Sequence, residues 1–192
     1  MNHRPVDPVR LTTPLSRQDV ESLHTGDRVL LSGFVYTARD AAHARLIALL
    51  EQGRPLPFPT EGQVLYYVGP TPPRPGMPIG SAGPTTSGRM DSSTPALLAA
   101  GIRGLIGKGS RSAEVRAALV KHHAVYFAAT GGAGALLAQK IKSAEMVAWE
   151  DLGAEAVRRL VFDDFPLVVI DDLFGNDLYE EGTARYRMEQ PT

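Results

Sequence analysis

Residues 83–91, Gly-Pro-Thr-Thr-Ser-Gly-Arg-Met-Asp, form the segment of this sequence that is best suited to binding an anion. Two glycines let backbone N–H groups approach a ligand closely, and three hydroxyls add further polar contacts. Arg89 follows with a guanidinium that can grip a carboxylate or a phosphate at two points. The segment predicts an anion site, and a polar turn is the alternative interpretation.

Lys108 stands in Gly107-Lys-Gly-Ser110, directly after an apolar pair. The pattern resembles a phosphate-binding loop of the GxxxxGK[ST] type but fails it, because Gly109 occupies the position that requires Ser or Thr. No nucleotide is therefore implied. A lysine on a flexible turn at a strand end suits a point-charge contact with an anion, and a simple connector is the alternative.

Residues 36–43, Tyr-Thr-Ala-Arg-Asp-Ala-Ala-His, lie where a predicted strand gives way to a predicted helix. Folds of the α/β class place ligand-binding groups at such junctions. Asp40 and His43 are three residues apart on the helix, so the carboxylate could orient or charge the imidazole. A solvated helix start with a charged pair is the alternative interpretation.

Three further motifs carry weaker signals. Residues 130–135 could bind an anion at a helix start, but Leu137 replaces the third glycine of a dinucleotide fingerprint, which favours a tight turn. Asp163-Asp164 and Asp171-Asp172 are expected at opposite ends of a short strand, which argues against a metal cluster. His122-His123 fit the capping of a helix C-terminus better than metal ligation.

The elements that must position these residues alternate along the chain. Strands are expected at residues 29–36, 63–68, 103–106, 124–128, 146–149 and 167–170, and helices near residues 16–26, 40–52, 94–101, 113–121, 134–141 and 155–160. Ser16 with Asp19 predicts a capping box at the first of these helices, and Thr94 before Pro95 predicts an N-cap at the third. This alternation predicts the α/β class with a largely parallel inner sheet and flanking helices. The expected organisation is an N-terminal arm (1–10), one domain (11–180) and a C-terminal tail (181–192).

The composition restricts the chemistry. The 192 residues are 43% hydrophobic with a formal charge of −1, which is enough for one core and gives no overall field that attracts nucleic acid. The sequence contains no cysteine, which excludes disulfides, a thiol nucleophile and an iron–sulfur cluster ligated by this chain alone. With no signal peptide or membrane segment recognised, the expected location is the cytoplasm.

The order of the motifs is more specific than any one of them. It runs through Leu11-Thr-Thr-Pro14, Thr37-Ala-Arg-Asp-x-x-His43, residues 83–91, Gly107-Lys-Gly109, Trp149-Glu-Asp-Leu-Gly153, Asp164-Phe-Pro166 and Gly175-Asn-Asp-Leu-Tyr179. In this order the motifs closely resemble the β subunit of class I fumarate hydratases and of the related L-tartrate dehydratases. The resemblance covers residues 11–179, which is most of the chain.

This resemblance implies a swivelling β/β/α fold and a hydro-lyase that reversibly removes water from a 2-hydroxy dicarboxylate. In such enzymes a partner α subunit or domain carries a [4Fe-4S] cluster on three cysteines, and the uncoordinated iron acts as a Lewis acid on the leaving hydroxyl. The chain is therefore expected to be active only with an α partner, in a heterotetramer of two α and two β subunits, and to bind no metal itself.

The resemblance also assigns roles to individual residues. The matching motif positions imply that Arg39, Arg89 and Lys108 hold substrate carboxylates and that His43 is an acid/base group. They place Thr85 at the substrate, near the carbon that exchanges a proton. Cations at the carboxylates would stabilise the charge that builds up during proton abstraction. A threonine hydroxyl is a weak base, so Thr85 would need a neighbour or an anionic form.

Two details favour fumarate as the substrate. The glycine-rich residues 127–134 and the Gly-Arg-Met-Asp form of the arginine segment look more like fumarases than tartrate dehydratases. The β subunit of an L-tartrate-type or mesaconate-type dehydratase with the same chemistry remains an alternative. A non-catalytic swivelling module that binds an anion or a partner is a third.

Overall fold

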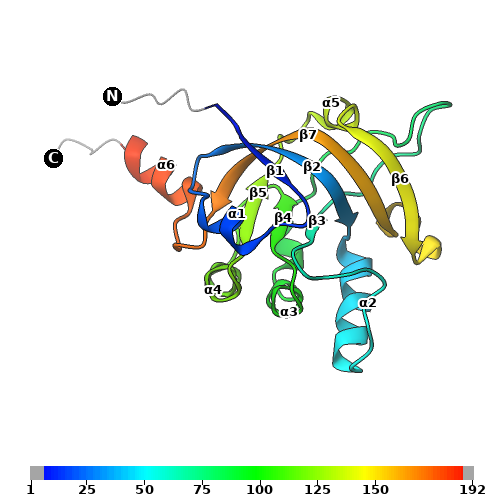
Figure 1. Cartoon of the computed structure of the whole chain (residues 1–192), viewed down its shortest axis with the longest axis horizontal. Coiled ribbons are helices and arrows are strands. Elements are labelled where there is room, and N and C mark those ends of the chain that lie inside the picture. The colour runs from blue at the N-terminus through cyan, green and yellow to red at the C-terminus, as the bar shows by residue number, and fades with distance from the viewer. Residues whose placement is uncertain (1–6, 188–192) are drawn as a thin grey trace.

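The computed structural model describes residues 7–187, and β-strands form its framework. The strands are β1 (Val9–Thr12), β2 (Arg28–Thr37), β3 (Val64–Tyr66), β4 (Gly104–Gly107), β5 (Val125–Ala128), β6 (Ile141–Ala148) and β7 (Val157–Asp171). They make one sheet in the order β1-β2-β3-β4-β5-β7-β6 (Figure 1). Because β2 also pairs with β7, the five strands β2, β3, β4, β5 and β7 close into a barrel.

The barrel is mixed in strand direction. Neighbours from β1 to β5 are parallel, as the alternation of strands and helices predicted. The long β7 runs antiparallel to β2, β5 and β6 and completes the ring. The mixed α/β class is therefore confirmed with a largely parallel half, and the closed barrel is a feature that the predicted inner sheet with flanking helices did not include. The swivelling β/β/α arrangement stays a prediction.

Helices cover the outside of this barrel. They are α1 (Arg17–Glu21), α2 (Asp40–Glu51), α3 (Thr94–Ala99), α4 (Ala113–His122), α5 (Gly134–Ala138) and α6 (Leu178–Tyr186), with 3-10 helices η1 (Ser87–Met90) and η2 (Glu150–Glu155). In Figure 1, α2, α3 and α4 lie together on one side of the strands, whereas α5 lies near β6 and β7. None of the described helices is both long and apolar enough to cross a membrane.

Alternating side chains divide the core into two parts. Along β3, Val64 and Tyr66 belong to the cluster that also contains Leu31, Phe127 and Phe165. These residues come from strands around the ring, so this cluster fills the barrel. The intervening Leu65 belongs to a second cluster, in which the helices contribute Leu46, Leu97 and Leu119. A period of two along the strands thus gives the sheet two apolar faces.

Local capping signals position several helices. Ser16 and Asp19 form the predicted capping box at α1, where each side chain binds the backbone of the other residue. His123 ends α4 in the left-handed conformation, in agreement with the predicted C-cap. Thr94 was expected to cap α3, but Ser93 occupies the cap position, and the Thr94 hydroxyl donates to the carbonyl of Met90 at 2.8 Å.

The C-terminal half contains the main corrections. The helix expected at residues 155–160 is wrong, because residues from Val157 onward belong to β7 and pair with strands on both sides. Asp163 and Asp164 therefore lie inside β7 and do not precede a strand. Val157 and Leu160 have helical spacing, but the two neighbouring strands outweigh this local preference.

Two other boundaries also differ from the prediction. The strand expected at residues 146–149 begins earlier, at Ile141, and ends at Ala148 because Trp149 has a positive φ of 59°. The helix expected to reach residue 141 ends at Ala138. Both differences reflect pairing of β6 with β7, since this pairing already includes Ile141 opposite Phe162.

Candidate functional site

The residues predicted to bind an anion come together at the carboxyl ends of three adjacent parallel strands. Arg39 lies just after β2 at the start of α2, and Lys108 lies just after β4. Thr85 and Arg89 come from the segment that follows β3, where the Thr85 N–H donates to the carbonyl of Tyr67 at 2.8 Å. Parallel strands bring such ends to one edge, which is where α/β folds bind ligands.

Asp40 lies between the two arginines. Its Oδ2 is 3.6 Å from Nη2 of Arg39, and its Oδ1 is 3.4 Å from Nε of Arg89. Arg89 also donates from Nη2 to the Thr85 hydroxyl at 2.6 Å. The ion pairs with Asp40 are longer than hydrogen bonds, so the two guanidiniums are held near each other without being fully occupied.

Arg39 is packed against the backbone that follows β3. A Cβ added to Gly69 would lie 2.4 Å from Nη1 of Arg39, so a larger residue there would displace the guanidinium. On its other side Arg39 reaches Glu155, whose Oε1 is 3.5 Å from Nη2. Glu155 also accepts the N–H of Ala41 at 2.8 Å and so fixes the first turn of α2.

Lys108 is joined to the arginine segment through the backbone. Its N–H donates to the carbonyl of Thr85 at 3.2 Å, and its carbonyl accepts the N–H of Ser87 at 2.9 Å. A Cβ on Gly107 would come within 1.9 Å of the Ser87 hydroxyl, so this close approach requires glycine. The lysine side chain is exposed, and no acidic side chain of residues 7–187 lies within ion-pair distance of it.

His43 lies beneath this group and is only 2% exposed. Its Nδ1 is 2.9 Å from the carbonyl of Arg39, and its ring meets that of Tyr67 edge-on at 5.2 Å. Burial lowers the pKa of His43 to about 4, so the imidazole is neutral at pH 7. Neutral His43 then donates from Nδ1, which ties its side chain to the backbone of Arg39.

Three buried polar atoms at the start of α2 have no hydrogen-bond partner within the described part of the chain. They are Nε of Arg39, Oδ2 of Asp40 and Nε2 of His43. Buried polar atoms are nearly always paired in folded proteins, so three unpaired atoms within five residues leave this helix start with free hydrogen-bonding capacity.

Among the weaker motifs, the glycine-rich segment has a contact with the site. Residues 130–135 lie beside the site, because a Cβ on Gly131 would contact the Lys108 side chain at 3.6 Å. Asp171 ends β7, whereas Asp163 lies within that strand. Between residues 7 and 187, no three histidine or acidic side chains are arranged to hold a metal ion.

Sequence reasoning missed two residues of this region. Glu155 contacts Arg39, but it was expected to begin a helix, so nothing pointed to a contact across the fold. Arg111 carries a fourth positive charge near the site, with its side chain fully buried. Its only sequence signal is its position three residues after Lys108, which does not reveal burial.

The arrangement can bind a small dianion. Arg39, Arg89 and Lys108 carry three positive charges, and Asp40 and Glu155 are the acidic groups in contact with the arginines. Two carboxylates of a ligand would supply acceptors for the guanidinium N–H groups and the ammonium group. Thr85 lies among these donors and is half-buried.

Comparison with known proteins identifies relatives of two kinds. The chain is 38% identical over 183 residues to fumarate hydratase 2 of Leishmania major, which covers 94% of the chain and 31% of that protein. It is 40% identical over 156 residues to the anaerobic class I fumarate hydratase of Escherichia coli K12, with 80% and 28% covered. It is 38% identical over 173 residues to a putative L(+)-tartrate dehydratase subunit beta of Methanocaldococcus jannaschii, with 87% and 89% covered.

The chain covers a different share of the length of each kind of relative. The chain spans under a third of the length of those two fumarate hydratases but most of the tartrate dehydratase subunit. The family described as the fumarase C-terminus matches residues 1–182. The chain therefore belongs to the fumarase C-terminal family, whose members include class I fumarate hydratases and L-tartrate dehydratase β subunits.

Proposed function

We propose that this chain is the β subunit of an iron–sulfur hydro-lyase that interconverts fumarate and malate. The observation that carries the proposal is the meeting of Arg39, Arg89 and Lys108, from three separate strand ends, around Thr85. Such a set suits a substrate with two carboxylates. The names of the fumarate hydratase relatives support this class of reaction.

In this proposal the cations act on the carboxylates. Removing a proton next to a carboxylate spreads negative charge onto that group, so Arg89 and Lys108 would stabilise the transition state more than the ground state. The guanidinium of Arg89 donates to the Thr85 hydroxyl and so stabilises negative charge on that oxygen. This contact supports a role for Thr85 in proton transfer.

A partner subunit must complete the site. The chain has no cysteine and cannot ligate an iron–sulfur cluster by itself, so the proposal assigns the [4Fe-4S] cluster to an α subunit. The three unpaired polar atoms at the start of α2 are consistent with a site that is closed by another chain or by substrate. Two α and two β subunits and a cytoplasmic location remain predictions.

His43 has two possible roles, and its burial makes them separable. An acid/base group must reach the substrate, whereas the observed side chain binds the carbonyl of Arg39. In His43→Gln, loss of one limb of the pH profile of kcat would support acid/base catalysis. A raised KM with an unchanged pH profile would instead support positioning of Arg39.

The decisive experiment is an assay of the chain with an α partner that supplies three cysteines. The mixed, reconstituted complex is expected to hydrate fumarate, and the chain alone is expected to bind no iron and to be inactive. Activity of the isolated chain in metal-free buffer would contradict the proposal. Failure of the two chains to associate at working concentrations would contradict it as well.

L-Tartrate is the second candidate substrate. The match to the Escherichia coli L(+)-tartrate dehydratase subunit beta covers 86% of that protein, at 32% identity. L-Malate, the hydrated form of fumarate, and L-tartrate differ by one hydroxyl group, which residues of the partner could recognise. Measuring kcat/KM of the same complex on fumarate, L-malate, L-tartrate and mesaconate would decide between these substrates. Inactivity on all four would favour a non-catalytic binding module.

A further inference from the structure

Arg111 is the most deeply buried cation of the described chain. Its side chain has no exposed surface, and its guanidinium lies between two tyrosine rings, 5.3 Å from the centroid of Tyr67 and 5.0 Å from that of Tyr126. A charge in such a place is costly unless it is paired and hydrogen-bonded. Since its side chain has no exposed surface, the guanidinium does not reach a substrate at the surface.

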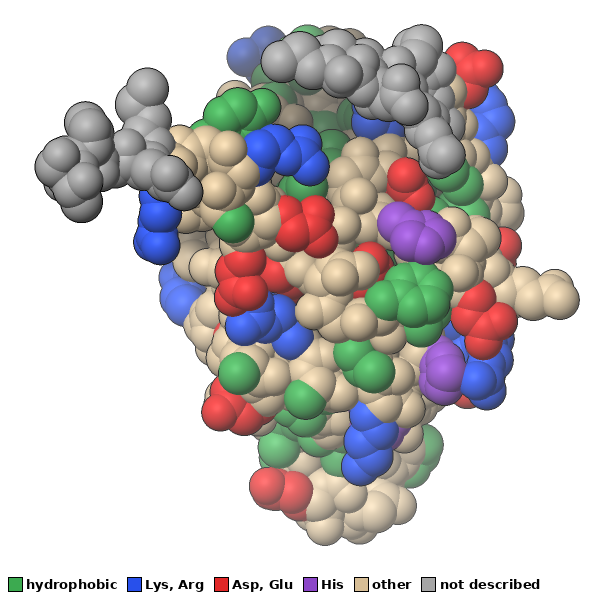
Figure 2. Space-filling model, turned by 90° about the vertical axis from the view of Figure 1, so that its left-hand side faces the viewer, with side chains coloured by type: hydrophobic (Ala, Val, Ile, Leu, Met, Phe, Trp, Pro, Cys, Tyr) green, Lys and Arg blue, Asp and Glu red, His purple; other side chains and the backbone are tan. Residues whose placement is uncertain are grey.

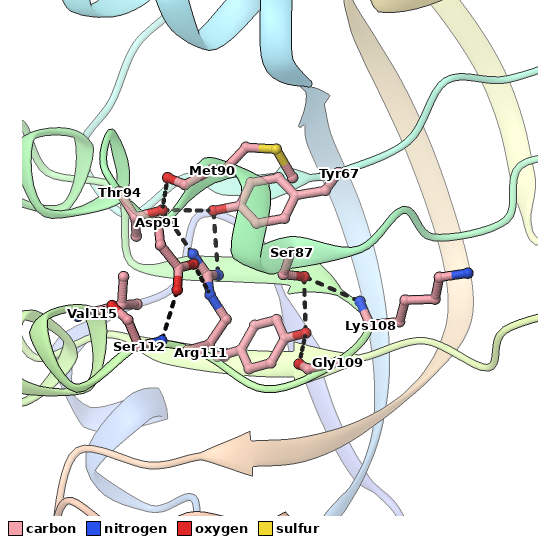
Figure 3. Close-up of polar contacts among 11 residues, drawn as sticks. Tyr67, Ser87, Met90, Asp91, Thr94, Lys108, Gly109, Arg111, Ser112 and Val115 are labelled. Carbon is pink, nitrogen blue, oxygen red and sulfur yellow. Dashed lines mark hydrogen bonds and ion pairs between the residues drawn. The ribbon is translucent and has the colours of Figure 1, made fainter.

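The hydrogen bonds of Arg111 lead to the turn that carries Arg89 (Figure 3). Nε donates to Oδ1 of Asp91 at 2.8 Å, and Nη2 donates to the Thr94 hydroxyl at 2.8 Å. Asp91 directly follows η1, and its other oxygen accepts the N–H of Ser112 at 2.7 Å. Arg111 thus fixes the end of the turn that carries Arg89 against the start of α4.

Tyr126 connects the same centre to the turn that carries Lys108. Its hydroxyl donates to the carbonyl of Gly109 at 2.8 Å and lies 2.9 Å from the Ser87 hydroxyl. The Ser87 hydroxyl in turn accepts the N–H of Lys108 at 3.1 Å. Figure 3 shows the contacts of the Ser87 hydroxyl, with the Lys108 side chain pointing away from them.

Tyr67 connects Arg111 to the segment that carries Arg39, the third cation. One face of its ring lies next to Arg111, and its ring also meets that of His43, which binds the backbone of Arg39. All three segments that carry the surface cations therefore contact a single buried group or its immediate neighbours. Arginine suits this place better than lysine, because a planar guanidinium can stack on two rings while its edge donates hydrogen bonds.

We propose that Arg111, with Asp91 and Tyr126, is a positioning residue that sets the distance between the Arg89 turn and the Lys108 turn. The proposal rests on the proposed function only in that these two cations are taken to hold substrate carboxylates. Small displacements of such groups have large effects, since a misplacement of about 1 Å can cost roughly a hundredfold in rate.

Two variants test this proposal, and a third serves as the control. Tyr126→Phe removes one hydroxyl and keeps the ring beside Arg111, so it is expected to fold. Arg111→Lys keeps the charge but loses the stacking on the two tyrosine rings and the hydrogen bonds from the edge of the guanidinium. Arg116→Lys makes the same exchange at an arginine whose ion pairs are with Asp177 and Glu180.

The first measurement is amide hydrogen exchange of the full chain. Tyr126→Phe is expected to accelerate exchange of the Ser87 and Lys108 amides by about tenfold or more, while the Glu181 amide in α6 keeps its rate. Arg116→Lys should leave the Ser87 and Lys108 amides unchanged. Unchanged exchange at these two amides in Tyr126→Phe would overturn the proposal, whatever reaction the protein catalyses.

The second measurement is the separation of KM from kcat in the assembled complex. Displaced carboxylate-binding groups should raise KM about tenfold in Tyr126→Phe, and more in Arg111→Lys. Simple loss of folded protein would lower apparent kcat and leave KM unchanged, and that result in Tyr126→Phe would overturn the proposal. If the wild-type complex is inactive on every dicarboxylate, the proposed function fails, whereas the exchange measurement still decides whether the turns are positioned by Arg111.

Discussion

Basic side chains are loosely paired with acidic ones in one region of this molecule and closely paired in another. In the strand-end site, Arg89 lies 3.4 Å from Asp40, and Lys108 lacks an acidic neighbour within the described residues. Where α4 meets α6, Arg116 pairs with the buried Asp177 at 2.8 Å and also contacts Glu180. Loosely held cations remain available to a ligand, whereas closely paired ones join two elements.

The surface around α1 and α6 carries charges of both signs. Figure 2 shows the side that lies at the left of Figure 1, where α1 and α6 are, and basic and acidic side chains are mixed there without a patch of one sign. Mixed charges neutralise one another and give no preference for an anion. The contrast predicts that substitutions in the strand-end site affect activity, and that substitutions at the α4–α6 contact affect stability.

Lys108→Met should have the largest effect. It removes one cation from the site while the flanking glycines preserve the turn. If Lys108 contacts a carboxylate in a closed site, the loss should be about 2 to 5 kcal/mol of transition-state binding, or roughly 30-fold to several thousand-fold in kcat/KM. The assay is steady-state kinetics of the assembled complex on fumarate and tartrate. A loss below about threefold on both would remove Lys108 from the site.

Arg89→Lys should have the next largest effect, because lysine keeps the charge but cannot grip a carboxylate at two points or donate to Thr85 in the same geometry. We expect kcat/KM to fall by roughly tenfold to a hundredfold with an unchanged melting temperature. Near wild-type kcat/KM in a normally folded variant would show that Arg89 serves the structure only.

Asp171→Asn tests a buried charge near the α4–α6 contact. Asp171 is 1% exposed, and neither of its carboxylate oxygens has a hydrogen-bond partner within the described residues. Burial, followed by the charge of Asp177, raises the pKa of Asp171 to about 7. The folded protein therefore holds a proton that the unfolded chain has already lost, and Asp171 lowers stability as pH rises from about 4 to 7.

The expected result is a melting temperature that rises in Asp171→Asn, by more at pH 8 than at pH 5. Activity of the complex should change little at either pH. An equal change in melting temperature at both values would mean that the carboxyl group titrates normally and that its burial carries no electrostatic cost.

Arg116→Met should have the smallest effect on activity, with kcat/KM within about twofold of wild type. It removes the pair with Asp177, which still accepts the N–H of Tyr179 at the start of α6. The free energy of unfolding should fall by roughly 1 kcal/mol, since Arg116 is partly exposed. Thermal melting measures the loss, and an activity loss as large as that of Arg89→Lys would erase the distinction between the two regions.

Features that depend on neighbours along the chain could be predicted from the amino-acid sequence. The strand-to-helix junction before Arg39, the glycine-flanked Lys108 and the capping box at Ser16 are local patterns, and the structure has each of them where it was predicted. Arg89 and Lys108 could be named as anion contacts from their local motifs, whereas Arg39 and Thr85 were assigned to the substrate by the family resemblance. The roles of Arg39, Thr85, Arg89, Lys108 and His43 in catalysis remain predictions.

Contacts between segments that are distant in sequence could not be predicted and are seen only in the folded chain. β7 includes most of the residues 155–160 that were predicted as a helix. It forms a strand and closes the barrel because its hydrogen bonds are made with β2, β5 and β6. Likewise, the contact of Glu155 with Arg39 and the burial of Arg111 between Tyr67 and Tyr126 join residues far apart in sequence. Local propensity carries no information about such partners, since desolvation and strand pairing arise only when the chain has folded.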